Sequence, residues 1–273
     1  MPEGPEIRLV ADRLERALAG QVARRVRFGQ SRMAGRGEEL EGLRVESVTP
    51  RGKALLTRFE GGRVLYTHNQ LYGKWMTCLP ERPPATTRSL RVAIETDRKW
   101  ALLYSASDIE LLYEEDLEEH PFLAKLGPDL LDERTTPAVV RRRLADRRFR
   151  GRALGSLLLD QGFVAGIGNY LRSEILFFAG LTPEQRPKDL DDDERAHLAR
   201  TMKAVIRRSY RTKGVTELAS YAKAARAAGE PRRHWRHAVF ARGGQDCRRC
   251  GTRIEKERVA TRQYYRCRTC QAR

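Results

Sequence analysis

The first twenty residues carry the clearest periodic pattern in the chain. Apolar residues recur there at the spacing of one helical face, a proline stands near the start and a glycine follows the end. The pattern therefore predicts an amphipathic helix at the beginning of the protein. Its apolar positions are Ile7, Val10, Leu14, Ala17 and Leu18.

Short runs of alternating apolar and polar residues follow, separated by glycines. Alternation indicates half-buried strands, and strands at such close spacing are typical of a β-sandwich or barrel. The proline-rich stretch over residues 79–88 interrupts them as an exposed loop. The predicted strands are VARRVRF (22–28), LRVESV (43–48), KALLTRF (53–59), RVLYTH (63–68), KWMTCL (74–79), LRVAIET (90–96) and KWALLYS (99–105).

The pattern changes near residue 120 and becomes mostly helical from Pro137 onward. Residues 211–236 are basic and rich in alanine, and no element is predicted there. We therefore expect an α+β protein with an N-terminal β-sandwich domain over 1–122, a linker over 123–136, a helical domain over 137–237 and a small module over 238–273. The predicted helices are 137–146, 153–161, 169–180 and 191–210.

The charge of the chain points to a polyanionic partner. Lys and Arg total 53 against 36 Asp and Glu, which gives a net charge of +17, and residues 141–152 alone hold seven Arg and one acid. A membrane-surface protein would share this charge, but no long basic amphipathic helix with aromatic anchors is present. No apolar run is long enough to span a membrane, and no signal-peptide core opens the chain. Nucleic acid is the expected partner, and the odd number of cysteines fits a reducing cytoplasm.

Four of the five cysteines form a compact pattern at the end of the chain. They are spaced C-x2-C-x16-C-x2-C, with a segment between the pairs that fits a β-hairpin, as in zinc ribbons. Four thiolates complete a tetrahedral site, so the spacing predicts one structural zinc; two disulfides are the alternative. The predicted ligands are Cys247, Cys250, Cys267 and Cys270.

The chain start offers candidate chemistry. Pro2 follows the initiator Met, and removal of that Met would leave a free secondary amine, which is nucleophilic near neutral pH because α-amino groups titrate near pH ~8. Attack on a sugar carbon would give an iminium, and Glu3 could move protons beside it. Pro at position 2 and Glu at a helix start are both common, so these two residues alone leave the chemistry open.

Five motifs together resemble one family of base-excision repair enzymes, the formamidopyrimidine-DNA glycosylase and endonuclease VIII family. The resemblance covers essentially the whole chain in order. It implies a helix-two-turn-helix element in the helical domain and a zinc finger at the end. The motifs are MPEGPE at the start, RGKALLT around Lys53, HNQLYGKW from residue 68, LLLDQGFVAGIGNYLRSEIL from residue 157, and the four-cysteine module.

The resemblance assigns catalytic roles to three residues near the start of the chain. Pro2 would attack C1′ of the damaged nucleotide and displace the base, with Glu3 as acid/base partner and Lys53 on a phosphate. Protons at C2′ and then C4′ become acidic in the iminium, so β- and δ-elimination would cut both sides of the sugar. The family's chemistry needs no small-molecule cofactor.

The resemblance also implies contacts with damaged double-stranded DNA. Asn169 would cap a helix and present its amide to phosphate, although a purely structural cap is the alternative. Arg262 would reach the phosphates that flank the flipped nucleotide, with Arg258 and Arg266 close to it in sequence. Lys125 stands where the endonuclease VIII branch usually has an arginine, and lysine lacks the planar fork for bidentate phosphate binding.

The lesion class follows from the loop that fills the gap left by a flipped base. Gln70, Leu71 and Tyr72 stand together and resemble the void-filling loop of the endonuclease VIII branch; a plain β-turn is the alternative. Oxidised pyrimidines such as thymine glycol are therefore the expected substrates. The segment 213–240 is longer than expected for that branch, so oxidised purines are the alternative substrates. A zinc-ribbon DNA-binding protein without catalysis is the alternative of another class. Nothing in the sequence requires an oligomer.

Overall fold

The computed structural model describes residues 2–259 and 261–272. The chain divides into two compact units, Met1–Lys125 and Leu126–Arg273, and the division falls inside the segment predicted as a linker. We describe each unit by itself. Among the described residues, no helix is both long enough and apolar enough to cross a membrane.

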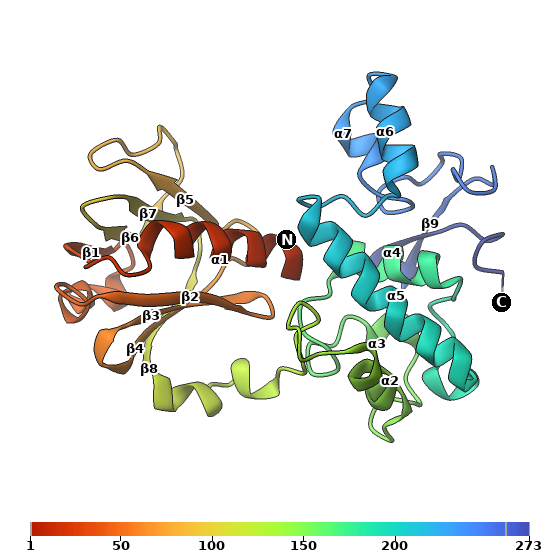
Figure 1. Cartoon of the computed structure of the whole chain (residues 1–273), viewed down its shortest axis with the longest axis horizontal. Helices are drawn as coiled ribbons and strands as arrows, with labels where there is room; N and C mark the ends of the chain where they lie inside the picture. The colour runs from red at the N-terminus through yellow and green to blue at the C-terminus, as the bar shows by residue number, and fades with distance from the viewer. Residues whose placement is uncertain (1, 260, 273) are drawn as a thin grey trace. The chain divides into compact units, whose positions relative to one another are not determined.

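The first unit is a β-sandwich with one helix, as predicted (Figure 1). Helix α1 (Gly4–Leu18) is followed by two antiparallel four-stranded sheets, in the orders β2-β3-β4-β8 and β1-β6-β7-β5. Seven strands match the predicted runs, and the eighth, β8, was not predicted. The strands are β1 (Arg25–Phe28), β2 (Val45–Arg51), β3 (Ala54–Phe59), β4 (Arg63–His68), β5 (Lys74–Cys78), β6 (Leu90–Glu95), β7 (Trp100–Tyr104) and β8 (Asp108–Tyr113).

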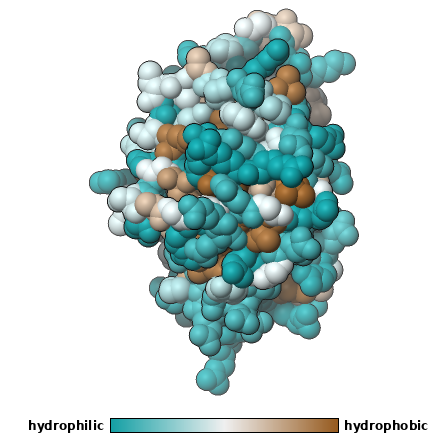
Figure 2. Space-filling model, turned by 90° about the vertical axis from the view of Figure 1, so that its left-hand side faces the viewer, coloured by the Kyte–Doolittle hydropathy of each residue, from teal (hydrophilic) through white to brown (hydrophobic). Residues whose placement is uncertain are grey.

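The core of this unit joins α1 to both sheets. Leu14 and Leu18 of α1 are fully buried in one cluster with Leu65 of one sheet and Val92 and Leu103 of the other. This cluster confirms the apolar helix face predicted from the sequence. On the outside of the same unit, the face in Figure 2 is mostly hydrophilic, with hydrophobic residues in small separate patches.

Helix α1 runs antiparallel to β2. Near the C-terminal end of the helix, the Glu15 carboxylate accepts a hydrogen bond from the Val48 amide, and the Gly20 amide donates to the Val45 carbonyl at 2.8 Å. The beginning of β2 therefore lies beside the end of α1. It follows that the start of α1 points to the same end of the unit as the turn between β2 and β3 (Figure 1).

The second unit is helical and ends in a β-hairpin. Its largest core cluster packs α5 against α2 and α4, and the hairpin contributes the fully buried Tyr264 to it. The unpredicted segment 211–236 forms two helices, α6 and α7. The elements are α2 (Pro137–Ala145), α3 (Leu154–Leu157), α4 (Asn169–Ala179), α5 (Asp192–Arg211), α6 (Ala219–Ala227), α7 (Arg232–Trp235), β9 (Glu255–Val259) and β10 (Arg262–Arg266).

Candidate active site and nucleic-acid contacts

Pro2 and Glu3 stand directly before α1. Glu3 is the N-cap residue, and its backbone amide donates a hydrogen bond to Glu6 Oε2 at 3.0 Å. The Glu3 residue is 4% exposed, whereas Pro2 is half-buried. This hydrogen bond fixes the backbone of Glu3, the residue that follows Pro2. The orientation of the Pro2 ring is therefore set by the first turn of α1.

Lys53 lies in the tight turn that joins β2 to β3. Arg51 pairs with Ala54, so Gly52 and Lys53 are the two turn residues. Gly52 has a φ of 61°, a conformation that glycine adopts at little cost, and Lys53 has no positive φ, as in a type II′ turn. Although it belongs to a turn, Lys53 is only 9% exposed.

The β2–β3 turn, the end of β4 and the start of β8 lie at one end of the sheet. Ala54, next to Lys53, pairs with His68, and His68 pairs with Asp108. Burial lowers the pKa of His68, the Lys53 charge lowers it further, and the Asp108 charge raises it. The start of α1 points to this same end, so Pro2 and Glu3 are at the end of the unit that carries Lys53.

The loop after β4 carries the predicted void-filling residues. The Gly73 amide donates to the Asn69 carbonyl at 2.7 Å and closes the loop, and a Cβ on Gly73 would come within 2.5 Å of that carbonyl oxygen. Leu71 and Tyr72 are 64% and 70% exposed, in a unit whose other large apolar side chains are mostly buried. Two projecting apolar side chains on a closed loop are suited to insertion between bases.

In the second unit, Asn169 is the first residue of α4, and Gly168 is the N-cap. The prediction that Asn169 caps the helix is therefore wrong, because Gly168 has the extended backbone of the cap position. Asn169 Nδ2 donates instead to the Gln263 carbonyl of β10 at 2.8 Å. This bond ties the start of α4 to the hairpin.

Arg172 reinforces the same junction, and the sequence reasoning did not single it out. Its guanidinium is fully buried, and its hydrogen-bond acceptors come from three parts of the unit. They are the Gly155 carbonyl at 2.9 Å, the Val259 and Gln263 carbonyls at 3.2 and 3.3 Å, and Asn169 Oδ1 at 2.9 Å. One planar fork thus holds the hairpin, α3 and Asn169 in a fixed arrangement.

The structure distinguishes Arg262 from two other arginines close to it in sequence, Arg258 and Arg266. Arg262 is exposed at the turn end of the hairpin and pairs with Val259, so it shares the strand face that packs on the helical core. Arg258 is also exposed but pairs with Gln263 on the opposite face. Arg266 is buried between Glu184 at 3.3 Å and Glu257 at 2.9 Å. Arg262 is next in sequence to Gln263, whose carbonyl accepts from Asn169 Nδ2, so it lies beside the junction of the hairpin with α4.

The four predicted zinc ligands come together. All four Sγ atoms lie within 4.8 Å of one another, with Cys250 and Cys267 at 3.3 Å and Cys247 and Cys270 at 3.9 Å. Zn–S bonds of ~2.3 Å in a tetrahedron place the sulfur atoms about 3.8 Å apart. The residues present therefore fit one zinc ion held by four thiolates, with no position left for a substrate.

A buried carboxylate anchors the chain just before this module. Glu174 of α4 accepts hydrogen bonds from the amides of Ala238, Val239 and Phe240 at 2.8 to 2.9 Å, and from the Thr216 hydroxyl at 2.6 Å. Burial raises the pKa of Glu174, and these hydrogen bonds lower it. Since the Thr216 hydroxyl gives its hydrogen to Glu174, His237 Nδ1 donates to that hydroxyl at 2.8 Å.

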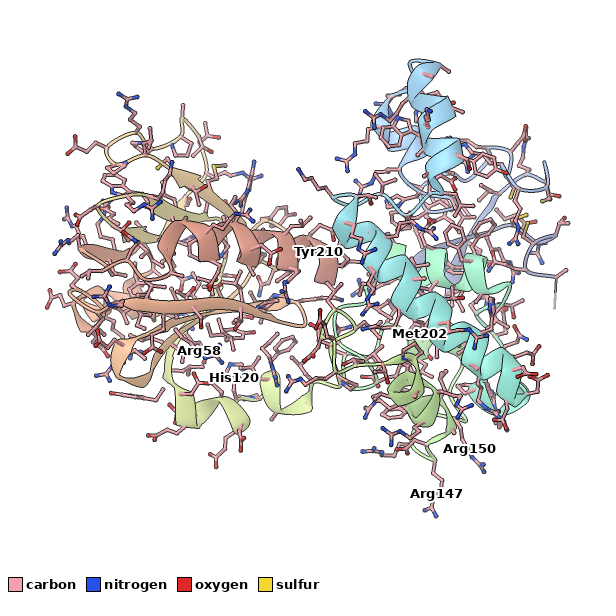
Figure 3. The ribbon with its side chains drawn as sticks, viewed as in Figure 1. Arg58, His120, Arg147, Arg150, Met202 and Tyr210 are labelled. Atoms are coloured by element: carbon pink, nitrogen blue, oxygen red, sulfur yellow. The ribbon has the colours of Figure 1, made fainter. Side chains whose placement is uncertain are left out.

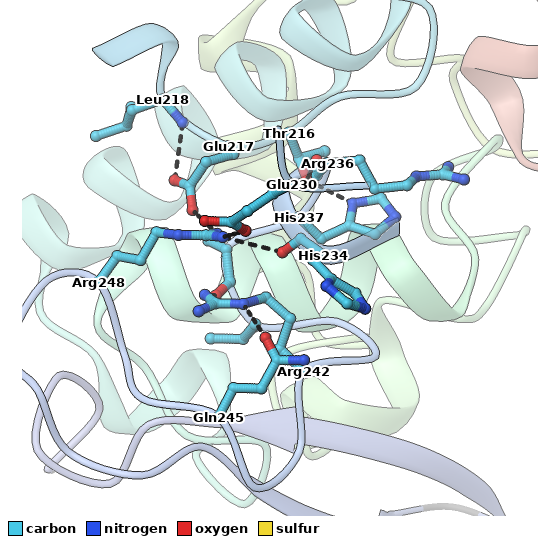
Figure 4. Close-up of polar contacts among 12 residues, drawn as sticks. Thr216, Glu217, Leu218, Glu230, His234, Arg236, His237, Arg242, Gln245 and Arg248 are labelled. Atoms are coloured by element: carbon cyan, nitrogen blue, oxygen red, sulfur yellow. Dashed lines mark hydrogen bonds and ion pairs between the residues drawn. The ribbon is translucent and has the colours of Figure 1, made fainter. Parts of the chain in front are cut away.

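The segment 211–236 also packs on the first zinc knuckle (Figure 4). Arg248, between Cys247 and Cys250, pairs with Glu217 at 3.2 Å and Glu230 at 3.4 Å and donates to the His234 carbonyl at 3.0 Å. These contacts give the segment a supporting role for the cysteine module.

Exposed arginines form a basic surface on α2 and the loop after it. Figure 3 shows Arg147 and Arg150 pointing away from the body of the unit. Arg143 differs, because it donates to the Gly162 and Phe163 carbonyls at 2.7 Å each. In the first unit, Lys125 is exposed at the end of a short 3-10 turn. The exposed arginines of the surface are Arg141, Arg142, Arg147, Arg148 and Arg150.

Comparison with known proteins finds two matching family models. They are the formamidopyrimidine-DNA glycosylase N-terminal domain over residues 1–107 and the formamidopyrimidine-DNA glycosylase H2TH domain over residues 126–220. Endonuclease 8 of an Escherichia coli strain is 46% identical over 274 residues, which cover 99% of this chain and 100% of the relative. Endonuclease 8 of Salmonella enteritidis is 45% identical with the same coverage.

Solved structures share the fold. The MutM (Fpg) protein of Thermus thermophilus is 30% identical, with a TM-score of 0.79 over 99% of both chains. The Fpg protein of Lactococcus lactis in complex with DNA containing an oxidised pyrimidine is 22% identical, with a TM-score of 0.82 over 100% of both chains.

Proposed function

Because the chain belongs to the formamidopyrimidine-DNA glycosylase and endonuclease VIII family, we propose that Pro2 is its nucleophile and that Glu3 and Lys53 act beside it. The protein is an endonuclease VIII homologue, a DNA glycosylase and AP lyase for oxidised pyrimidines in base-excision repair. The observation that carries the residue assignment is that the start of α1, the Lys53 turn and the exposed loop 69–73 belong to the same unit, with Pro2 and Lys53 at one end of it.

The reaction begins at the secondary amine that Pro2 gains when Met1 is removed. The nitrogen forms a bond to C1′ of the damaged nucleotide, and the glycosidic bond breaks as the base leaves with its electron pair. Opening of the sugar ring gives an iminium, with Glu3 moving the proton at the ring oxygen. Glu3 directly follows Pro2 and is the N-cap residue of α1, so its place beside the nucleophile supports this role.

Strand cleavage follows from the same intermediate. Loss of a proton from C2′ of the iminium expels the 3′ phosphate, and loss of a second proton from C4′ expels the 5′ phosphate. Lys53 is suited to hold one of these phosphates, because its short turn and small exposure limit where the ammonium can go.

Damaged double-stranded DNA is the proposed partner. Arg262 in the second unit and Lys125 in the first are exposed, so both are available to phosphates. The Asn169 amide nitrogen donates to the Gln263 carbonyl and carries a second N–H that could reach a phosphate. Leu71 and Tyr72 would fill the gap left by the flipped nucleotide, with Gln70 toward the orphan base. The four cysteines would hold one zinc that fixes the hairpin carrying Arg262.

The test is borohydride trapping on a duplex with one thymine glycol, followed by peptide mapping of the cross-link. We expect the adduct at Pro2, and a weaker adduct in Pro2→Gly, because the primary amine of glycine is less nucleophilic than the secondary amine of proline. An adduct mapped to another residue would refute the assignment of the nucleophile. An adduct formed on an 8-oxoguanine duplex but not on thymine glycol would move the enzyme to oxidised purines.

A further inference from the structure

Arg88 lies at the end of the proline-rich loop over residues 79–88 and contacts the loop that carries Leu71 and Tyr72. Its Nη1 donates a hydrogen bond to the Tyr72 carbonyl at 2.8 Å. A guanidinium only donates and a carbonyl only accepts, so the direction of this hydrogen bond is fixed. We infer that Arg88 is a positioning residue that holds loop 69–73 in the shape from which Leu71 and Tyr72 enter the base stack. The inference deepens the proposed function and depends on it for the role of that loop.

The peptide group between Tyr72 and Gly73 is held on both sides. Its N–H, which is the Gly73 amide, donates to the Asn69 carbonyl at 2.7 Å, and its carbonyl accepts from Arg88. A peptide group is planar, so two hydrogen bonds on opposite sides fix the orientation of the whole plane. This plane is bonded to the Tyr72 Cα, and it therefore limits the directions in which the Tyr72 side chain can project.

Arg88 reaches the loop from an anchored backbone. Its amide donates to Thr86 Oγ1 at 3.2 Å, and the carbonyl of the next residue, Ser89, accepts from the Ser105 amide at 2.9 Å. Strand β6 begins one residue later, at Leu90. The guanidinium therefore ties the projecting loop to the start of a strand.

The restraint matters because the two apolar side chains of the loop project into water. Leu71 and Tyr72 are 64% and 70% exposed, so packing within the protein does little to fix them before DNA binds. A loop that is ordered beforehand loses less conformational entropy when its side chains enter the stack. Without Arg88, the loop would have to be ordered during insertion, which would slow excision of a base that must be flipped.

The experiment compares Arg88→Met with Arg82→Met, which removes the same charge from an exposed position in the same proline-rich loop. Arg82 bonds within its own loop, from its amide to the Leu79 carbonyl at 3.2 Å. Single-turnover excision from a thymine glycol duplex at saturating enzyme should be about two- to tenfold slower in Arg88→Met than in Arg82→Met, because one ordering hydrogen bond is lost. Amide hydrogen exchange of the peptide that covers residues 69–73, measured on the free protein, should be faster by a similar factor.

A second background tests whether Arg88 acts through the projecting side chains. Leu71→Ala removes one of them, so adding Arg88→Met should slow excision by a smaller factor there than in the wild type. The inference is overturned if Arg88→Met matches Arg82→Met in excision or in exchange, or if it slows excision by the same factor in Leu71→Ala. Failure of the proposed function looks different: the wild type would leave the thymine glycol duplex uncleaved, while the exchange comparison would still report on the loop.

Discussion

Replacing Arg172 by Met should loosen the zinc hairpin from the helical unit. The substitution keeps a long side chain and removes the guanidinium, which donates to acceptors in Gly155, Val259, Asn169 and Gln263. The Gln263 carbonyl keeps its bond from Asn169 Nδ2, so the main losses are at the Gly155 and Val259 carbonyls. At about 1 to 1.5 kcal/mol for each bond, with some return from no longer burying a charge, the hairpin should lose about 1–3 kcal/mol.

The assay is amide hydrogen exchange of peptides that cover β9 and β10, read by mass spectrometry. A loss of about 1–3 kcal/mol should speed exchange there by about 5- to 150-fold, while α1 is unaffected. Arg142→Met is the matched control, because it removes the same charge from an exposed position on α2. If hairpin exchange in Arg172→Met does not exceed that in Arg142→Met, the clamp assigned to Arg172 is refuted.

Three further outcomes follow from the structure. Cys267→Ala removes a fully buried ligand, so the variant should bind less than one zinc per chain and bind abasic-analogue duplex more weakly than the wild type; full zinc content by elemental analysis would contradict this. Burial, and then the charges of Arg236 and Arg232, lower the pKa of His237 to about 3, so its neutral form stabilises the fold above pH ~6.5 and this stability is lost as the pH falls toward 3. At pH 5 the free energy of unfolding should be about 2 kcal/mol lower than at pH 7.5 because of His237. In urea unfolding, His237→Gln should therefore lose less stability than the wild type between pH 7.5 and 5. Equal losses in the two proteins would argue against a buried neutral His237. Leu71→Ala should change the free energy of unfolding by less than about 0.5 kcal/mol, because Leu71 is exposed, yet slow base excision from thymine glycol duplex; an unchanged rate would remove Leu71 from the void-filling role.

Elements with a strong local pattern could be predicted from the sequence. The apolar face of α1 and the alternation of seven strands gave the β-sandwich, which the structure confirms. Strand β8 was missed, because its alternation is short and its partner β4 ends 40 positions earlier in the chain. Pairing at that distance depends on the whole sheet, which a local window does not contain.

The helix predicted over 153–161 was too long, and the reason is local chemistry. Only Leu154–Leu157 is α-helical. Asp160 Oδ1 accepts from the Gly162 amide at 2.8 Å, and Gln161 Oε1 accepts from the Gly166 amide at 3.1 Å. Side chains that bind nearby amides offer the backbone an alternative to the helix, and here they build the turns before α4.

The same distinction holds for the site residues: those with a local signal in the sequence were predicted, and those without one were missed. Cysteine spacing predicted the metal ligands, and motif resemblance indicated Pro2, Glu3 and Lys53. Arg88 and Arg172 carried no such signal, because each acts through a partner far away in sequence. Two charged residues, Arg172 and Glu174, stand between the apolar Leu171 and Ile175, and this was the local hint that Arg172 is buried.

The buried Glu174 has a consequence for how the protein is made. The amide of Ala238, its first backbone partner, is 64 positions later in the chain. At a synthesis rate of about 5–20 residues per second, the carboxylate waits about 3–13 s on the ribosome before that partner exists. During that time α4 is complete, but the Glu174 carboxylate is still in contact with water on a helix face that is buried in the folded unit. The second unit therefore cannot close around Glu174 until residues 238–240, which stand just before the cysteine module, have been made.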